Sequence, residues 1–409
     1  MSGEPELAVG ADAFAQAGAG LEVAVVGAGA IGATAAYDLA REGAEVTLYD
    51  RGSIAAESSG RAAGVCYNAF ADPLDAEIGT EAIERFRALS GDDTFPFVER
   101  PYVWLAREGD AERADAIREQ VRRMQENDVV AVAVGPDELD DRFPELETED
   151  VAVAGIVGAA GYTDPAAYTA CLAAAANGAG ATLATETPVS VRADPPRVVR
   201  EGDGTVREVD AVLVAAGAHT KRLLADAGIS IAMKPYRVQA LVADADLAEP
   251  MVFDATGDFY CRPHPDGLLA GDGTERVEAD PDGYDRNADP GFAEGLLDRV
   301  AERLPGVETD LDRAWAGLCT ATPDRDPLVG ELADGLYVAT GFQGHGFMRA
   351  PAIGQRIADQ ILGGKGIGPF DPTRFDGDES FEIAAGMTID GAETGIEGGD
   401  DTEAESQVR

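Results

Sequence analysis

The segment Val23-Ala-Val-Val-Gly27-Ala-Gly29-Ala30-Ile31-Gly32 decides the fold of this 409-residue chain. Its apolar start predicts a buried strand over residues 21–26, and a helical pattern follows over 30–42. A second apolar run at 45–49 predicts the next strand. The strand–helix–strand order is typical of a doubly wound α/β fold with a parallel sheet.

The three glycines of this segment have the spacing of a dinucleotide-binding turn. Gly27 permits the tight turn, Gly29 lets the backbone approach a pyrophosphate, and Gly32 lets the helix pack on the strand. The start of the helix offers unpaired N–H groups to phosphates. Asp50 follows the second strand, where an acid accepts hydrogen bonds from the ribose hydroxyls of an adenosine. The segment predicts a dinucleotide site and leaves FAD and NAD both open.

The charge of the chain is strongly acidic. Asp and Glu number 76 against 32 Lys and Arg, which gives a net charge of -44. This balance excludes a general nucleic-acid binder and argues against docking on an anionic membrane. Residues 376–409 hold 11 of the acids and one base, so most of the negative charge lies elsewhere. We therefore expect a surface suited to molar salt, in a halophilic cytosol.

The sequence shows no signal for export, membrane insertion or metal binding. The first 20 residues contain no Lys or Arg, unlike a signal peptide, and no apolar run reaches the ~18 residues of a membrane span. The four cysteines form no metal-ligand cluster. We expect a cytoplasmic protein with reduced cysteines and without a metal.

Five further motifs follow in a specific order. They are Ser58-Ser-Gly-Arg61-Ala62-Ala-Gly64, the VLVAAGAHT run at 212–220, Tyr260-Cys-Arg262-Pro-His264-Pro-Asp-Gly267, the TPDRDPLVG run at 322–330, and Gly341-Phe-Gln-Gly344-His345-Gly346-Phe347. Through this combination the chain resembles the D-amino-acid-oxidase-like superfamily of FAD-dependent amine oxidoreductases, in the style of sarcosine oxidase, glycine oxidase and D-proline dehydrogenase. The resemblance covers roughly residues 21–370.

The resemblance implies a discontinuous architecture. A doubly wound, Rossmann-like FAD-binding domain would use residues 21–80, 151–235 and 312–375. A smaller substrate or cap domain with an antiparallel sheet would use 81–150 and 236–311. We expect residues 1–20 to be a flexible leader and 376–409 to be a disordered acidic tail.

The resemblance also implies which residues hold FAD. Val189 would touch the adenine end through its backbone, and Ala216 and Gly217 would pass the pyrophosphate. The loop carrying Ser59, Arg61, Ala62 and Gly64 would lie against the cofactor. Gly344, His345, Gly346 and Phe347 would lie at the pyrimidine edge of the flavin, where backbone N–H groups at a helix start stabilise charge developing at N1 and O2. Gly317 stands where covalently flavinylated members carry a Cys, so we expect non-covalent FAD.

Substrate recognition is predicted from one strand. Tyr260, Arg262 and His264 alternate along it, so their side chains share a face. If that face looks at the flavin, Arg262 could bind a substrate carboxylate bidentately; pairing with a surface acid is the alternative reading. Arg61 and Arg349 are rival candidates. Tyr260, Arg262 and His345 are thus the predicted catalytic set.

Two departures from the family pattern bear on the electron acceptor. Leu269 replaces a lysine that assists reaction with oxygen in some members, and Met348 replaces a carboxylate-binding lysine. The resemblance then favours a dehydrogenase over an oxidase, with a carrier protein, a quinone or oxygen as the acceptor.

The expected reaction is oxidation of the CH–NH bond of a small amino acid that is N-methylated, glycine-like or D-configured. Hydride transfer to flavin N5 would give an imine, which water hydrolyses. Three alternatives stay open: a 2-hydroxy-acid dehydrogenase with His264 or His345 as base, an NAD-dependent dehydrogenase, and a non-catalytic flavoprotein subunit of a larger complex. An oligomer is compatible with each of them.

Overall fold

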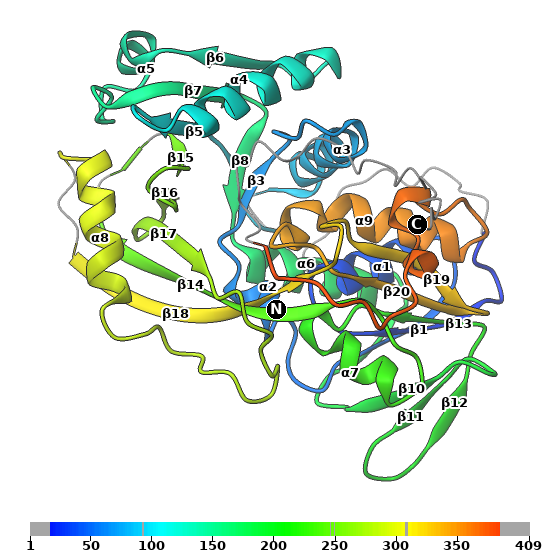
Figure 1. The fold of residues 1–409 in the computed structure, drawn as a ribbon. Helices are drawn as coiled ribbons and strands as arrows, with labels where there is room; N and C mark the ends of the chain where they lie inside the picture. Colours follow the sequence, from blue (N-terminus) through cyan, green and yellow to red (C-terminus); the bar gives the residue numbers. More distant parts are fainter. Residues whose placement is uncertain (1–16, 92–93, 246, 249, 307–309, 385–409) are drawn as a thin grey trace, which may run out of the picture.

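A computed structural model describes residues 17–91, 94–245, 247–248, 250–306 and 310–384. Two large β-sheets organise this part of the chain, with helices packed around them (Figure 1). No helix among these residues combines the length and the apolar content that crossing a membrane requires.

The first sheet has six strands in the order β19-β20-β13-β1-β2-β9. It contains the predicted strand–helix–strand unit, formed by β1 (Glu22–Val26), α1 (Ala30–Arg41) and β2 (Glu45–Tyr49). β1 is parallel to β2 and β13, while β19 pairs antiparallel with β20. The other strands are β9 (Thr182–Ala184), β13 (Ala211–Val214), β19 (Leu328–Ala333) and β20 (Leu336–Thr340). The predicted parallel α/β sheet is confirmed.

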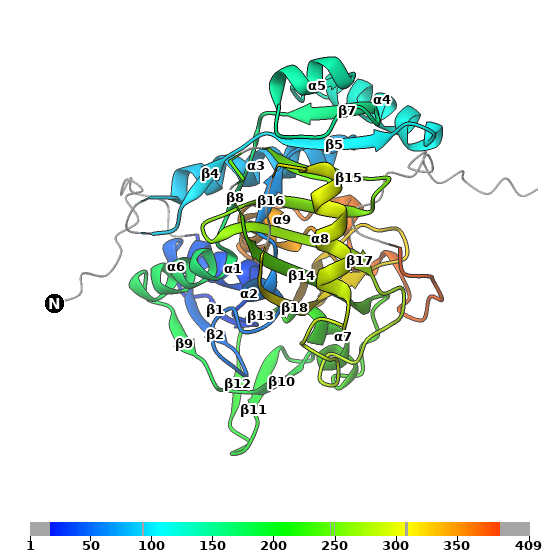
Figure 2. The same ribbon diagram turned by 90° about the vertical axis from the view of Figure 1, so that its left-hand side faces the viewer.

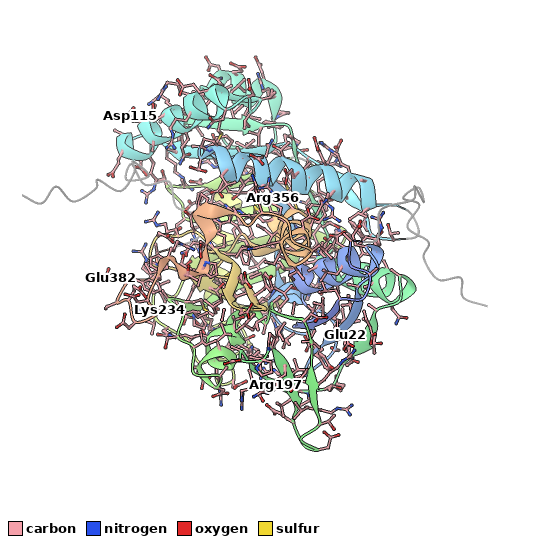
Figure 3. All side chains as sticks on the ribbon, turned by 90° about the vertical axis from the view of Figure 1, so that its right-hand side faces the viewer. Glu22, Asp115, Arg197, Lys234, Arg356 and Glu382 are labelled. Atoms are coloured by element: carbon pink, nitrogen blue, oxygen red, sulfur yellow. The ribbon has the colours of Figure 1, made fainter. Side chains whose placement is uncertain are left out.

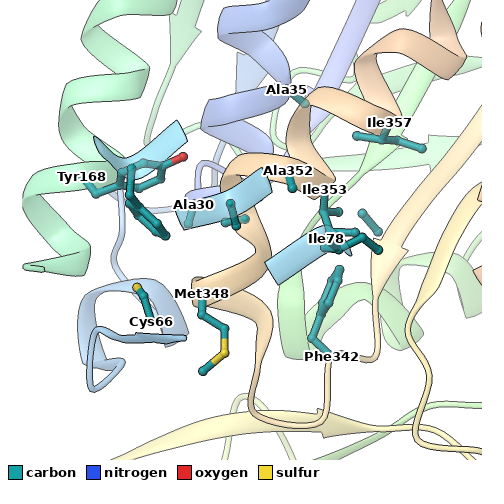
Figure 4. Packing of buried hydrophobic residues seen from close by; sticks show 14 of the residues in the cluster. Ala30, Ala35, Cys66, Ile78, Tyr168, Phe342, Met348, Ala352, Ile353 and Ile357 are labelled. Carbon is teal, nitrogen blue, oxygen red and sulfur yellow. The ribbon is translucent and has the colours of Figure 1, made fainter. Parts of the chain in front are cut away.

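Side chains alternate between the two faces of this sheet. Val25 and Leu48 belong to the core formed with α1, α6 (Pro165–Gly178) and α9 (Gly346–Ile361). Figure 4 shows Ala35, Tyr168 and Ile353 of these three helices. On the opposite face Val26 belongs to a separate core. That core is completed by α7 (Thr220–Ala225) and a small antiparallel sheet of β10 (Val189–Arg192), β11 (Arg197–Arg200) and β12 (Val206–Glu208).

The second sheet has eight strands in the order β18-β14-β17-β16-β15-β5-β7-β6 (Figure 2). Its neighbours are antiparallel apart from the parallel pair β15–β5. α8 (Phe292–Arg303) packs on β16 and β17, and α4 (Ala111–Glu126) packs on β5, β6 and β7. The strands are β5 (Tyr102–Arg107), β6 (Ala131–Val134), β7 (Val151–Val157), β14 (Lys234–Asp244), β15 (Met251–Asp254), β16 (Phe259–His264), β17 (Gly267–Thr274) and β18 (Asp310–Ala321).

Shorter elements connect the two large sheets. A further three-stranded sheet has the order β3-β8-β4, and α3 packs against β3. These elements and the remaining helices are α2 (Ser58–Arg61), β3 (Val65–Tyr67), α3 (Pro73–Leu89), β4 (Phe97–Glu99), α5 (Pro136–Arg142) and β8 (Ala160–Thr163).

Two strands at predicted domain boundaries join the eight-stranded sheet. β7 and β18 belong to the eight-stranded sheet, although the boundaries at 151 and 312 assigned them to the FAD-binding domain. An apolar run such as residues 151–157 does not identify which sheet accepts it. The last long helix, α9, begins at Gly346, so Pro351 lies inside it.

The chain after Phe375 is not simply a disordered tail. Ile383 is 4% exposed and packs in a cluster with Tyr236 and Ala321. The Gln343 side chain donates from Nε2 to the carbonyl oxygen of Ala384 at 2.7 Å, and Lys234 donates to the carbonyl oxygen of Phe381. Residues 376–384 therefore form a packed segment on the body of the protein, with Lys234 and Glu382 at one edge of Figure 3.

The rest of both predicted tails, residues 1–16 and 385–409, lies outside the described residues. Residues 17–20 of the predicted leader form a turn, in which the N–H of Gly18 donates to the carbonyl oxygen of Glu42 at 2.9 Å.

Candidate dinucleotide site

A cavity of about 630 Å³ runs between the two large sheets. The residues that follow β1, β2 and β13 line it, and strands of the eight-stranded sheet close its other side. The carboxyl ends of neighbouring parallel strands are where open α/β sheets bind their ligands. The cavity therefore lies where the glycine-rich segment predicted a dinucleotide.

The glycine turn has no room for side chains. Gly27 has a φ of +112°, and a Cβ there would collide with the carbonyl oxygen of Ala215. A Cβ on Gly32 would collide with the carbonyl oxygen of Gly27, because α1 starts close against β1. The turn can thus bring backbone N–H groups close to a phosphate.

Asp50 fixes this turn and also lines the cavity. Its Oδ2 accepts from the N–H of Ala28 and its Oδ1 from that of Gly52, both at 2.7 Å. Each carboxylate oxygen keeps a second lone pair that can accept a hydroxyl. The hydroxyl of Ser59 meanwhile accepts from the N–H of Ala30 at 2.9 Å, so Ser59 positions the start of α1.

Val189, Ala216 and Gly217, which were expected to contact FAD, line the same cavity. Charged residues gather beside them. Arg51 pairs with Asp282 at 2.7 Å, and Asp282 also pairs with Arg222.

Arg61, Ala62, Gly64 and Gly317 line the cavity too. The Arg61 Nη1 donates to the carbonyl oxygen of Ala56 at 2.6 Å and lies 3.4 Å from Glu57. Its Nε and Nη2 have no hydrogen-bond partner among the described residues.

Gly344, His345, Gly346 and Phe347 bring the start of α9 to the cavity. No side chain caps this helix, and no described residue accepts from the N–H groups of Gly346 and Phe347. Such free donors at the start of a helix stabilise negative charge. Burial, with a smaller contribution from Arg349, lowers the pKa of His345 to about 3, so its imidazole is neutral.

Aromatic residues also line the cavity. They are Tyr260 together with Tyr67, Phe253, Trp315 and Tyr236, which the sequence did not single out, and the Tyr67 ring centroid lies 6.3 Å from that of His345 at the start of α9. Burial raises the pKa of Tyr260 and raises that of the Cys319 thiol to about 11, so both groups stay protonated. These aromatic residues come from distant strands, and no local pattern groups them.

The structure separates Arg262 from this set. Tyr260 lines the cavity, but Arg262 and His264 line a second one. The segment carrying Ala63 crosses in front of Arg262, whose Nε donates to the Ala63 carbonyl oxygen at 2.6 Å. Arg349 also faces away, paired with Asp75 at 2.8 Å. The alternation along β16 was predicted, whereas the segment that divides its face was not.

The residues present fit FAD. The crowded glycine turn, the free lone pairs of Asp50 and the uncapped α9 start lie along one cavity, as an elongated dinucleotide requires. The family model described as FAD-dependent oxidoreductase (DAO) matches residues 22–360. The chain belongs to this family.

Individual relatives agree with this assignment. Glycine oxidase of Geobacillus kaustophilus is 27% identical over 356 residues, covering 83% of this chain and 92% of the relative. Its crystal structure superposes with a TM-score of 0.77 at 26% identity, covering 87% of this chain and 99% of that one. L-proline dehydrogenase from P. horikoshii gives a TM-score of 0.78 at 26% identity, covering 87% and 98% of the two chains.

Human mitochondrial dimethylglycine dehydrogenase is 26% identical over 385 residues. The match covers 87% of this chain but 44% of that protein, so the chain spans less than half of it.

Proposed function

We propose that this flavoprotein oxidises the CH–NH bond of a small amino acid, N-methylated, glycine-like or D-configured, using non-covalently held FAD. The observation that supports this best is that Tyr67 and Tyr260 share one cavity with the uncapped start of α9, where Tyr260 and Cys319 stay protonated and His345 is neutral. Hydride loss from a neutral amine needs no side-chain base, so such a lining is sufficient. The names of the relatives, glycine oxidase, dimethylglycine dehydrogenase and L-proline dehydrogenase, support an amino-acid substrate.

FAD supplies the acceptor for the two electrons. The chain itself supplies binding, orientation and charge. The N–H groups of Gly346 and Phe347 would stabilise negative charge that develops during the reaction, and Tyr67, Tyr260 and Trp315 would pack on the substrate and exclude water.

Arg61 is our candidate for the substrate carboxylate, in place of Arg262. The other arginines among the described lining residues, Arg51 and Arg222, pair with Asp282. Arg61 keeps two donors free. We expect Arg61→Met to raise KM for carboxylate substrates about tenfold or more, since a hydrogen bond to a charged group contributes roughly 1.5–3 kcal/mol. Arg118→Met, on the exposed face of α4, is the control that removes the same charge.

A 2-hydroxy-acid substrate is the second candidate. His345 lines the cavity and is the candidate for taking the hydroxyl proton that this oxidation releases, although a pKa of about 3 makes it a weak base. His345→Gln should abolish hydroxy-acid oxidation and largely spare amine oxidation.

Product analysis tests the proposal. Turnover with a panel of N-methyl, D- and unsubstituted amino acids should release an amine or ammonia together with a carbonyl product. Electron transfer to an artificial dye that exceeds oxygen consumption would support the dehydrogenase assignment. Release of 2-oxo acids from hydroxy acids alone would overturn the amine proposal.

A further inference from the structure

Arg262 is a buried cation without a carboxylate partner. Its side chain lies in β16, and the residue is 3% exposed. The Nε donates to the carbonyl oxygen of Ala63 and the Nη1 to that of Pro263, each at 2.6 Å, and the guanidinium lies 4.7 Å from the Tyr162 ring centroid. No described Asp or Glu forms an ion pair with it, and its Nη2 donates to no described residue.

The other buried arginines of the described chain behave differently. Arg237 pairs with Asp289 at 2.9 Å, Arg303 with Asp254 at 2.9 Å, and Arg349 with Asp75 at 2.8 Å. Acids outnumber bases 76 to 32 in this chain, so partners are plentiful. A buried charge without a counter-charge is costly, and burial lowers the pKa of Arg262 to about 10.

Arg262 lines a second cavity, of about 690 Å³. Arg61, Ala62 and Trp315 line both this cavity and the dinucleotide cavity, so they form the wall between the two. The Trp315 Nε1 holds the wall together by donating to the carbonyl oxygen of Arg61 at 3.0 Å.

Further donors surround this second cavity. The Nδ1 of His264 accepts from the N–H of Asp266 at 3.1 Å, which leaves Nε2 as the donor of the neutral ring. Arg313 also lines it and forms an ion pair with Asp312 at 2.5 Å. The two acids of the lining, Asp164 and Asp266, contact groups other than Arg262. Asp164 accepts from Ala166 at the start of α6, and Asp266 lies 3.8 Å from His264 and 3.7 Å from Arg313.

We propose that the second cavity binds a small organic anion whose carboxylate or phosphate group pairs with Arg262. An oxyanion would supply the negative charge that no described Asp or Glu provides, and it would accept a hydrogen bond from the Arg262 Nη2. The volume lies within the usual range of small-molecule sites, and Tyr162 and Trp315 offer apolar surface to the rest of the ligand. Arg61, Ala62 and Trp315 separate this site from the dinucleotide cavity, so the inference stands whether or not the proposed amine oxidation is correct.

Equilibrium dialysis of the FAD-loaded full chain tests the site. Radiolabelled inorganic phosphate and acetate, at constant chloride, are the probes. We expect saturable binding of one anion per chain for at least one probe, and the better-bound probe identifies the group. Arg262→Leu should weaken binding at least tenfold, whereas Arg118→Leu, an equal charge change on exposed α4, should leave it unchanged.

A second variant covers the case in which Arg262→Leu does not fold. Ala166→Trp fills the cavity from a half-buried position and keeps the arginine. It should block anion binding while the flavin absorbance persists. Absence of saturable binding of either probe, or equal weakening by Arg118→Leu, would overturn the proposal.

Discussion

Gly32 lies in the first turn of α1, and its missing side chain lets that helix approach the glycine turn. Gly32→Ala should lower the free energy of unfolding by about 1–3 kcal/mol, as overpacking does, and should reduce FAD retention. Gly295→Ala, in α8, is the matched control because nothing lies within 4 Å of its added Cβ. It should stabilise the protein by up to about 1 kcal/mol. Flavin content and urea unfolding are measured for both variants. A Gly32→Ala variant that retains as much flavin as the unsubstituted protein would contradict the account.

His345 makes a definite prediction for stability against pH. Its pKa is about 3 in the folded protein and ordinarily about 6.5, so the unfolded chain binds the proton first as pH falls. The contribution of His345 to the free energy of unfolding is therefore fully present above about pH 6.5. It is lost on acidification toward pH 3, by at most about 1.4 kcal/mol per pH unit. His345→Gln should lack this component. Urea unfolding of both proteins between pH 7 and pH 5 checks it, and parallel curves would show that the imidazole is not buried and neutral.

Single residues also mark how far the sequence predicts the site. The glycine turn and Asp50 were predicted because a local pattern specifies their backbone. Arg262 was misplaced because the period of a strand says which side chains share a face, but not that the chain at Ala63 crosses that face. Tyr67 and Trp315 come together only through tertiary folding.

At the level of elements, the sequence predicted strands better than their partners. The assignment of β7 and β18 to the eight-stranded sheet depends on pairings with β5 and β14. Those partners lie 40 or more residues away in the chain, beyond the reach of a local pattern.

The packed segment 376–384 could not be predicted from composition, which indicated a disordered tail. Ile383 lies against Tyr236, which lines the dinucleotide cavity. Ile383→Ala should destabilise the protein by about 2–5 kcal/mol, the usual cost of emptying a buried aliphatic site, and should loosen FAD. Glu382→Ala, at the exposed neighbour, is the control. Thermal unfolding and flavin release measure the effect, and equal behaviour of the two variants would show that the segment is dispensable.

On the scale of the whole molecule, the acidic surface predicts a requirement for salt. Figure 3 shows oxygen-tipped side chains around the whole outline of the protein. With a net charge of -44, repulsion grows as the screening length lengthens to about 10 Å near 0.1 M salt. Dilution from molar KCl should lower Tm and release FAD, and NaCl of equal ionic strength should restore both. Unchanged flavin fluorescence and Tm without salt would overturn the halophilic prediction.

The whole account rests on a bound flavin that accepts electrons from an amine in the first cavity. Anaerobic mixing of the protein, as purified in molar KCl, with the amino-acid panel measures this most directly. We predict a yellow protein whose flavin absorbance is bleached by at least one amino acid bearing a CH–NH bond and recovers when an acceptor is added. A yellow protein that no amine bleaches, or a colourless protein that does not bind added FAD, would contradict it.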